Sequence, residues 1–346
     1  MAQPPSPMAL VKRTRAEALA FAEKAGHANV LKLLAKAQKE LEHRLNQTPG
    51  LVHAAGEPFS VVRMQLVLKQ VQAVTKALTA AMKGTLTDSG RTVAGKAAKD
   101  TADFMQAAEK RFRGISAVLP INVASMVDRA VSGSESSILH RIEGDPDHKG
   151  RPGVLARYGA ETITKFEERL QLGLVQGKRW EEVRDDLTSE SEFLQGAPKY
   201  WAERIVRTET LHSYNRAAHE SMKQTQEVLG DVVKILVATF DDRTGWDSYQ
   251  VHGQIRRPEE PFEWSKGSYM YPPNRPNDRE TTITYRISWP LEAELEPMSD
   301  GEVEDRYHEQ YPKGPGPGER PNMSTVDREL FGVQEPPEVG EGLLAE

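Results

Sequence analysis

The chain has 346 residues, no cysteine and a formal net charge of -6. The lack of cysteine excludes disulfides, thiolate zinc sites and cysteine nucleophiles, and the negative balance provides no overall basic field that would favour nucleic acid. Hydrophobic residues make up 38%, below the usual share for a compact domain, so we expect part of the chain to be extended when it is alone.

The N-terminal region is predicted to be a short arm followed by helices. Residues 1–7 are rich in proline and are expected to be disordered, and residues 8–150 follow as a helical region. Apolar residues at helical spacing predict a first helix that ends before Pro49 and Gly50. They are Val30, Leu34, Ala37, Leu41 and Leu45. A second helix is predicted from Met64 to Ala81 and a third from Arg91 to Arg113. The helical pattern that follows is broken at Pro120 and at Gly133.

A second region is predicted over residues 151–292, after turn-forming residues between Asp145 and Gly153. A helix is expected from Tyr158 to Gln176, with Gly177 as its C-terminal cap. A short amphipathic helix follows, and a longer one starts at Pro198 and ends near Glu227. The short helix is expected to bury Trp180, Val183 and Leu187.

The hydrophobic period changes after residue 230. Val232 to Phe240 and Thr281 to Trp289 are rich in β-branched and apolar residues, which predicts two strands. The fold class is therefore mainly α, with a helical body and a small C-terminal α+β unit of two to four strands. Residues 293–346 are rich in Glu, Pro and Gly, and we expect an extended or disordered acidic tail there.

One polar stretch, "FDDRTGWDSYQVHGQ" from Phe240 to Gln254, has the residue types of a metal or acid/base site. Carboxylates and an imidazole suit a divalent ion, and the candidate ligands are Asp241, Asp242, His252 and, less directly, Asp247. The alternative is structural, because aspartates at a strand end usually cap the following turn. Arg243 would then pair with a carboxylate, and Gly253 would supply a positive φ. The spacing matches no closed metal loop, so the pattern favours capping.

Four polar residues of the long helix, Thr208, His212, Asn215 and His219, share one face. This stripe predicts either a polar interface with the β unit, which we favour, or an ion site. The two histidines are seven residues apart, so the spacing of a zinc protease helix is not met. Arg207 and Glu209 point to different sides of the helix, and we expect their partners in the β unit, a catalytic glutamate being the alternative.

The order of these features resembles that of the phage minor head, or head-morphogenesis, proteins of the Mu F-like family. The matching residues are Arg207, Thr208, Glu209 and Asn215 on the helix, Asp241, Arg243 and Thr244 after the strand, and Gly253 and Gln254 at the turn. The Cys-Arg-Cys of the family corresponds either to Tyr285-Arg286-Ile287, which we prefer because Pro290 follows it, or to Asp278-Arg279-Glu280. Gly245 and Ser248 stand where relatives often carry cysteines.

The resemblance implies a structural protein of the virion, without established catalytic activity and without a cofactor. Such proteins are made in the bacterial cytoplasm and act in head assembly at or near the portal. Their expected partners are the portal protein and/or the major capsid protein, with packaged DNA as a further partner through local basic clusters such as Arg256-Arg257. No membrane anchor is expected, because no run of residues is long and apolar enough. The alternative is a metal-dependent nuclease or other hydrolase that uses Asp241, Asp242, His252 and Glu209.

Overall fold

The computed structural model describes most of the chain between residues 27 and 311. The described residues are 17, 20, 27–51, 56–114, 119–144, 152–189, 197–240, 244–264, 267–274, 278 and 280–311. The chain divides into two compact units, each assembled from separate segments. The helical unit contains Leu19–Thr92 and Ser134–Thr210, and the sheet unit contains Met1–Ala18, Val93–Gly133 and Leu211–Glu346. This division differs from the boundary predicted near residue 150, because the helices α3 (Val61–Arg113) and α7 (Ala197–Leu229) each contribute to both units.

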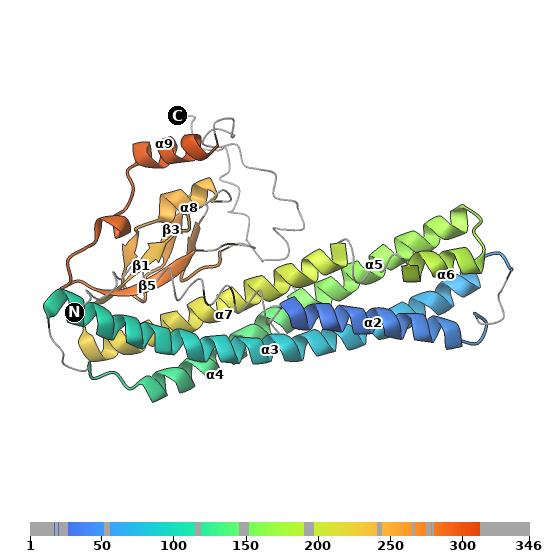
Figure 1. Ribbon diagram of the computed structural model, residues 1–346, viewed down its shortest axis with the longest axis horizontal. Coiled ribbons are helices and arrows are strands. Elements are labelled where there is room, and N and C mark those ends of the chain that lie inside the picture. The colour runs from blue at the N-terminus through green and yellow to red at the C-terminus, as the bar shows by residue number, and fades with distance from the viewer. Residues whose placement is uncertain are drawn as a thin grey trace, which may run out of the picture. The chain divides into compact units, whose positions relative to one another are not determined.

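The helical unit is built from amphipathic helices whose apolar stripes are buried. It contains α2 (His27–Gln47), α5 (Val154–Val175), α6 (Trp180–Ser189), the first part of α3, the second part of α4 (Val123–Glu143) and the start of α7 (Figure 1). All five apolar residues that predicted α2 are buried, as are the three predicted for α6. The side-chain amide of Gln38 on α2 donates a hydrogen bond to the carbonyl of Leu187 on α6, 3.3 Å away. These helix predictions are confirmed.

The turn between α5 and α6 forms as glycine chemistry predicts. Gly177 follows the last turn of α5 with a φ of +64°, a conformation that glycine adopts without a steric penalty. The backbone N–H of Phe59 donates to the carbonyl of Lys178 at 3.0 Å, and the ring of Phe59 stacks on Trp180 at 6.2 Å. The turn is thereby joined to the start of α3.

Two predicted helix breaks are wrong. The second and third predicted helices form the single helix α3, and α4 continues through Gly133. Met82 and Leu86 are buried within the expected break in α3, and Val93 is buried just after it. Burial of this continuous stripe outweighs the cost of about 1 kcal/mol for a glycine within a helix.

The sheet unit is centred on a three-stranded antiparallel sheet with the order β2-β1-β5. Strand β1 (Val232–Val237) pairs along its whole length with β5 (Thr281–Arg286), and β2 (Ile255–Arg256) pairs on its other side. Both predicted strands are therefore confirmed. A two-stranded hairpin, β3 (Phe262–Trp264) and β4 (Gly267–Tyr269), lies near the short helix α8 (Trp246–Val251) (Figure 1).

The two faces of the sheet belong to different hydrophobic clusters. Val233, Ile235 and Ile283 pack with residues of α3 and α7, including Met105 and Met222. The neighbouring residue Leu236 points to the opposite face and packs with residues of α8 and β3. This alternation follows from the two-residue period of a strand. The observed fold class is mainly α with a small C-terminal α+β unit.

The beginning of the predicted acidic tail is ordered, which corrects that part of the prediction. Ala293–Leu295 form a 3₁₀ turn (η2), and Asp300–Gln310 form a helix, α9. The prediction from acidic composition missed two apolar residues, Val303 and Tyr307, which are buried on one face of α9. Residues 312–346 and the arm 1–7 lie outside the described residues. Among the helices that the structure describes, none has the length and hydropathy needed to cross a membrane.

Candidate functional site

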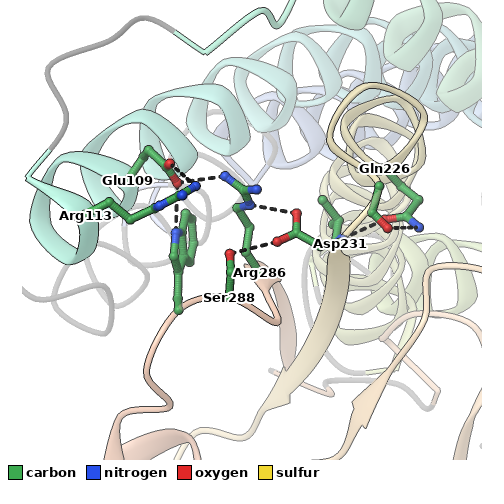
Figure 2. Close-up of polar contacts among 9 residues, drawn as sticks. Glu109, Arg113, Gln226, Asp231, Arg286 and Ser288 are labelled. Atoms are coloured by element: carbon green, nitrogen blue, oxygen red, sulfur yellow. Dashed lines mark hydrogen bonds and ion pairs between the residues drawn. The ribbon is translucent and has the colours of Figure 1, made fainter.

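Arg286 lies at the centre of an ion-pair network in the sheet unit (Figure 2). Its Nε donates to Oδ1 of Asp231 at 2.7 Å, and its Nη1 donates to Oε2 of Glu109 at 3.0 Å. Arg286 ends β5 opposite Val232, the first residue of β1, so Asp231 is brought within reach by the register of the sheet. Ser288 donates to the other carboxylate oxygen of Asp231 at 2.7 Å. One guanidinium thus joins the sheet to α3.

Glu109 is the buried acceptor of this network. Its Oε2 also accepts a hydrogen bond from the indole Nε1 of Trp289 at 2.8 Å, and its Oε1 accepts from Arg113 at 3.2 Å. The Trp289 ring packs against Phe112, with centroids 5.6 Å apart, and so excludes water from the carboxylate. The buried carboxylate of Glu109 thus accepts hydrogen bonds from Arg286, Trp289 and Arg113, two of which are charged.

The same network reaches α7 through Gln226. Its side-chain oxygen accepts from the backbone N–H of Val232 at 2.7 Å, and its nitrogen donates to the carbonyl of Gly230 at 3.1 Å (Figure 2). The end of α7, the start of β1, the end of β5 and α3 are therefore joined by polar contacts.

The contacts within the network favour the charged forms of Asp231 and Arg286. Burial by itself would raise the pKa of Asp231, but the hydrogen bonds from Arg286 and Ser288 and the charge of Arg286 hold that pKa below its ordinary value. Burial likewise opposes the charge on Arg286, yet Asp231 and Glu109 raise its pKa. Groups with these properties do not exchange protons near neutral pH, so the arrangement is suited to holding elements together.

Three of the four residues in the polar stripe of α7, His212, Asn215 and His219, contact the strands and turns of the sheet unit, as one of the two interpretations predicted. Tyr271 lies against His212 and His219, with ring centroids 5.5 and 5.2 Å away. Asn215 accepts a hydrogen bond from Thr281 at 3.0 Å and donates to the carbonyl of Glu280 at 3.4 Å. Burial, with the nearby charges of Lys234, Lys223 and Arg216, lowers the pKa of His219 to about 3. The ring is therefore neutral at physiological pH.

His252 is also buried, and both of its ring nitrogens contact backbone groups. Nδ1 accepts a hydrogen bond from the N–H of Ala238 at 3.2 Å, which leaves the proton on Nε2 to be donated to the carbonyl of Glu294 at 3.2 Å. Burial lowers the pKa of His252 to about 4. In this geometry neither nitrogen is available to a metal ion.

The neighbouring motif residues organise the turn between α8 and β2. Gly253 has a φ of +77°, as predicted, and its N–H donates to Leu236 at 2.8 Å. Gln254 forms a pair of side-chain hydrogen bonds with the backbone of Glu263, at 2.6 and 3.1 Å. Thr244 donates its hydroxyl hydrogen bond to the carbonyl of Thr239. These contacts join β1, α8 and β3.

Other predicted site residues are either elsewhere or not described. Arg207, Thr208 and Glu209 belong to the helical unit, where Glu209 is buried and accepts hydrogen bonds from Arg141 of α4 at 2.9 and 3.0 Å. This partner lies on a neighbouring helix of the same unit. Asp241, Asp242 and Arg243 lie outside the described residues, and Asp241 and Asp242 are two of the four proposed metal ligands. So do most residues of the predicted turn at 145–153.

Sequence reasoning missed Glu109, Asp231 and Lys234. Lys234 could have been noticed in the sequence, since it is a single charge within an apolar strand. Its Nζ is 4.7 Å from the centre of the Phe262 ring and donates a hydrogen bond to the carbonyl of Met270 at 2.8 Å. Glu109 carried no signal, because nothing local separates it from other acidic residues of α3. Within the described part of the chain, no group of three or more His, Asp or Glu residues is arranged to hold a metal ion.

Comparisons with known proteins identify no relative. No protein-family model, no curated protein and no solved structure matches the chain.

Proposed function

We propose that this protein is a structural component of a bacteriophage head, a minor capsid or head-morphogenesis protein that acts in assembly at or near the portal. The proposal rests on the ordered set of motif residues that resembles the Mu F-like family. The observation that carries it is the role of the described motif residues, because Arg286, Asn215, Gly253 and Gln254 each join secondary-structure elements. A motif made of such contacts preserves a scaffold and its surface, as an assembly protein requires.

The proposed partners are the portal protein and/or the major capsid protein, with packaged DNA as a further partner. The test is to co-express the affinity-tagged full chain with the portal protein of the same phage genome. We expect the chain to elute with the portal ring, and mass spectrometry of purified virions to detect it in few copies. Its absence from both the ring fraction and the purified virions would refute the proposal.

The alternative, a metal-dependent nuclease, has weaker support. His252 directs both ring nitrogens to backbone groups, and Glu209 accepts hydrogen bonds from Arg141. A plasmid-nicking assay with Mg²⁺ or Mn²⁺ separates the two functions. Cleavage by the intact chain that is lost in both Asp241→Ala and His252→Ala would favour the nuclease over a purely structural role.

A further inference from the structure

The last described helix, α9, lies beside α8 and contacts it (Figure 1). Val303, Tyr307 and Tyr311 recur every four residues, so they share a face of the helix. The ring of Tyr307 is 5.2 Å from Trp246 and 6.4 Å from Tyr249, in edge-to-face geometry. Val303 and Tyr307 are only 3% and 6% exposed, and Met298 packs against the same cluster. The attachment is thus made by a small group of apolar side chains, and Arg306 adds a contact 5.5 Å from the centre of the Phe240 ring.

The first turn of α9 is capped by residues of its own segment. The Ser299 backbone N–H donates to the Glu302 carboxylate at 2.9 Å, and the Glu302 N–H donates to the Ser299 hydroxyl at 3.4 Å. This capping box satisfies donors at the first turn without help from the sheet. The local signal for a helix therefore does not depend on contact with α8.

Residues 294–297, which precede α9, are anchored by burial and by backbone contacts. Leu295 is fully buried in the core beneath the sheet, and the carbonyl of Glu294 accepts the hydrogen bond from His252. The backbone of Glu296 and Pro297 approaches Gly253 so closely that a Cβ at this glycine would collide with it. A short connection therefore links the anchored segment to α9; it consists of Met298, which packs against the aromatic cluster, and Ser299, which caps the helix.

From these contacts we infer that α9 is an exchangeable helix, and that the aromatic face of α8 binds the α9 helix of a second copy of this chain. Simple release of α9 would expose Val303, Tyr307 and Tyr249 to water, which is unfavourable. Exchange with a second copy restores each of these contacts, because the two interfaces are identical. A short connection also favours exchange, since it limits how the helix can return to its own chain.

The test uses the full chain and a fluorescein-labelled peptide of residues 297–311. Tyr307→Ala weakens the internal contact, and Asp305→Ala, on the exposed face of α9, is the matched control. We expect the peptide to bind the Tyr307→Ala chain, as measured by fluorescence anisotropy, and not the wild-type or Asp305→Ala chains. A peptide that itself carries Tyr307→Ala is expected to bind at least about tenfold more weakly.

Light scattering over a range of protein concentrations tests whether two copies of the chain form a dimer. We expect dimers of the wild-type and Asp305→Ala chains to form as concentration rises, and the Tyr307→Ala chain to remain monomeric. If that variant unfolds, Val303→Ala replaces it as the milder change. Absence of peptide binding by a variant with wild-type circular dichroism would overturn the docking site. Peptide binding combined with a wild-type chain that stays monomeric at every concentration would overturn the exchange between copies.

Discussion

Replacing Arg286 with methionine should selectively destabilise the sheet unit. The change removes the hydrogen bonds to Glu109 and Asp231 while keeping an unbranched apolar stem. The Arg286 and Glu109 side chains are only 12% and 4% exposed, and breaking a buried pair costs about 3–5 kcal/mol. Glu109 keeps Trp289 and Arg113 as donors, and Asp231 is 28% exposed. We therefore expect the lower end of that range, about 3 kcal/mol.

Hydrogen exchange is the suitable assay, because a chain with two compact units need not unfold in one step. A loss of about 3 kcal/mol corresponds to exchange more than about a hundredfold faster for the amides of β1 and β5. Amides of α6, in the helical unit, should keep their rates. Arg286→Lys should be intermediate, because lysine retains the charge but not the two-pronged geometry.

Arg256→Met is the matched control on the same sheet. Arg256 lies 4.0 Å from Glu263, whose side chain is 75% exposed, so its loss should cost below about 1 kcal/mol. If Arg286→Met accelerates exchange in β1 and β5 no more than Arg256→Met does, the network does not hold the sheet to α3. Equal acceleration in α6 would contradict the assignment of this network to the sheet unit.

Three further predictions concern the turn and the buried bases. In Gly253→Ala the new Cβ would sit at a positive φ and would collide with backbone atoms, whereas in Gly230→Ala the φ is positive but the space is open. Gly253→Ala should therefore lower the free energy of unfolding by at least about 2 kcal/mol more than Gly230→Ala, as measured by urea denaturation. Burial lowers the pKa of Lys234 to about 8. The unfolded chain therefore retains a proton that the folded chain releases, and stability should rise from pH 8 toward 10.5; Lys234→Met should abolish this rise, and an unchanged slope would show that another group causes it. The depressed pKa values of His219 and His252, about 3 and 4, imply that stability falls as pH decreases from 6.5 toward 4, because only the unfolded chain binds the protons. NMR should show neither ring titrating above pH 5.

Much of the local structure was predictable because it depends on neighbours in the chain. The apolar stripe of α2, the glycine turn after α5 and the β-branched runs of β1 and β5 all express short-range preferences that burial reinforces. The positive φ of Gly253 followed from the same kind of local rule. The predictions at Gly133 and within α3 failed because long stripes of buried side chains outweighed a local preference against helix. In α9, the spacing of Val303 and Tyr307 was too short to stand out in an acidic segment.

The sequence by itself determined most of the long helices and the two paired strands β1 and β5. Only the tertiary structure decided their partners. Glu109 meets Arg286 across 177 residues, and Arg141 meets Glu209 across 68, through contacts that no local period records. The tertiary structure likewise decided that His252 forms hydrogen bonds with two backbone groups, because the tautomer and orientation of an imidazole depend on its surroundings. Local propensity acts over a few residues, whereas the pairing of buried charges depends on which surfaces the folded chain brings together.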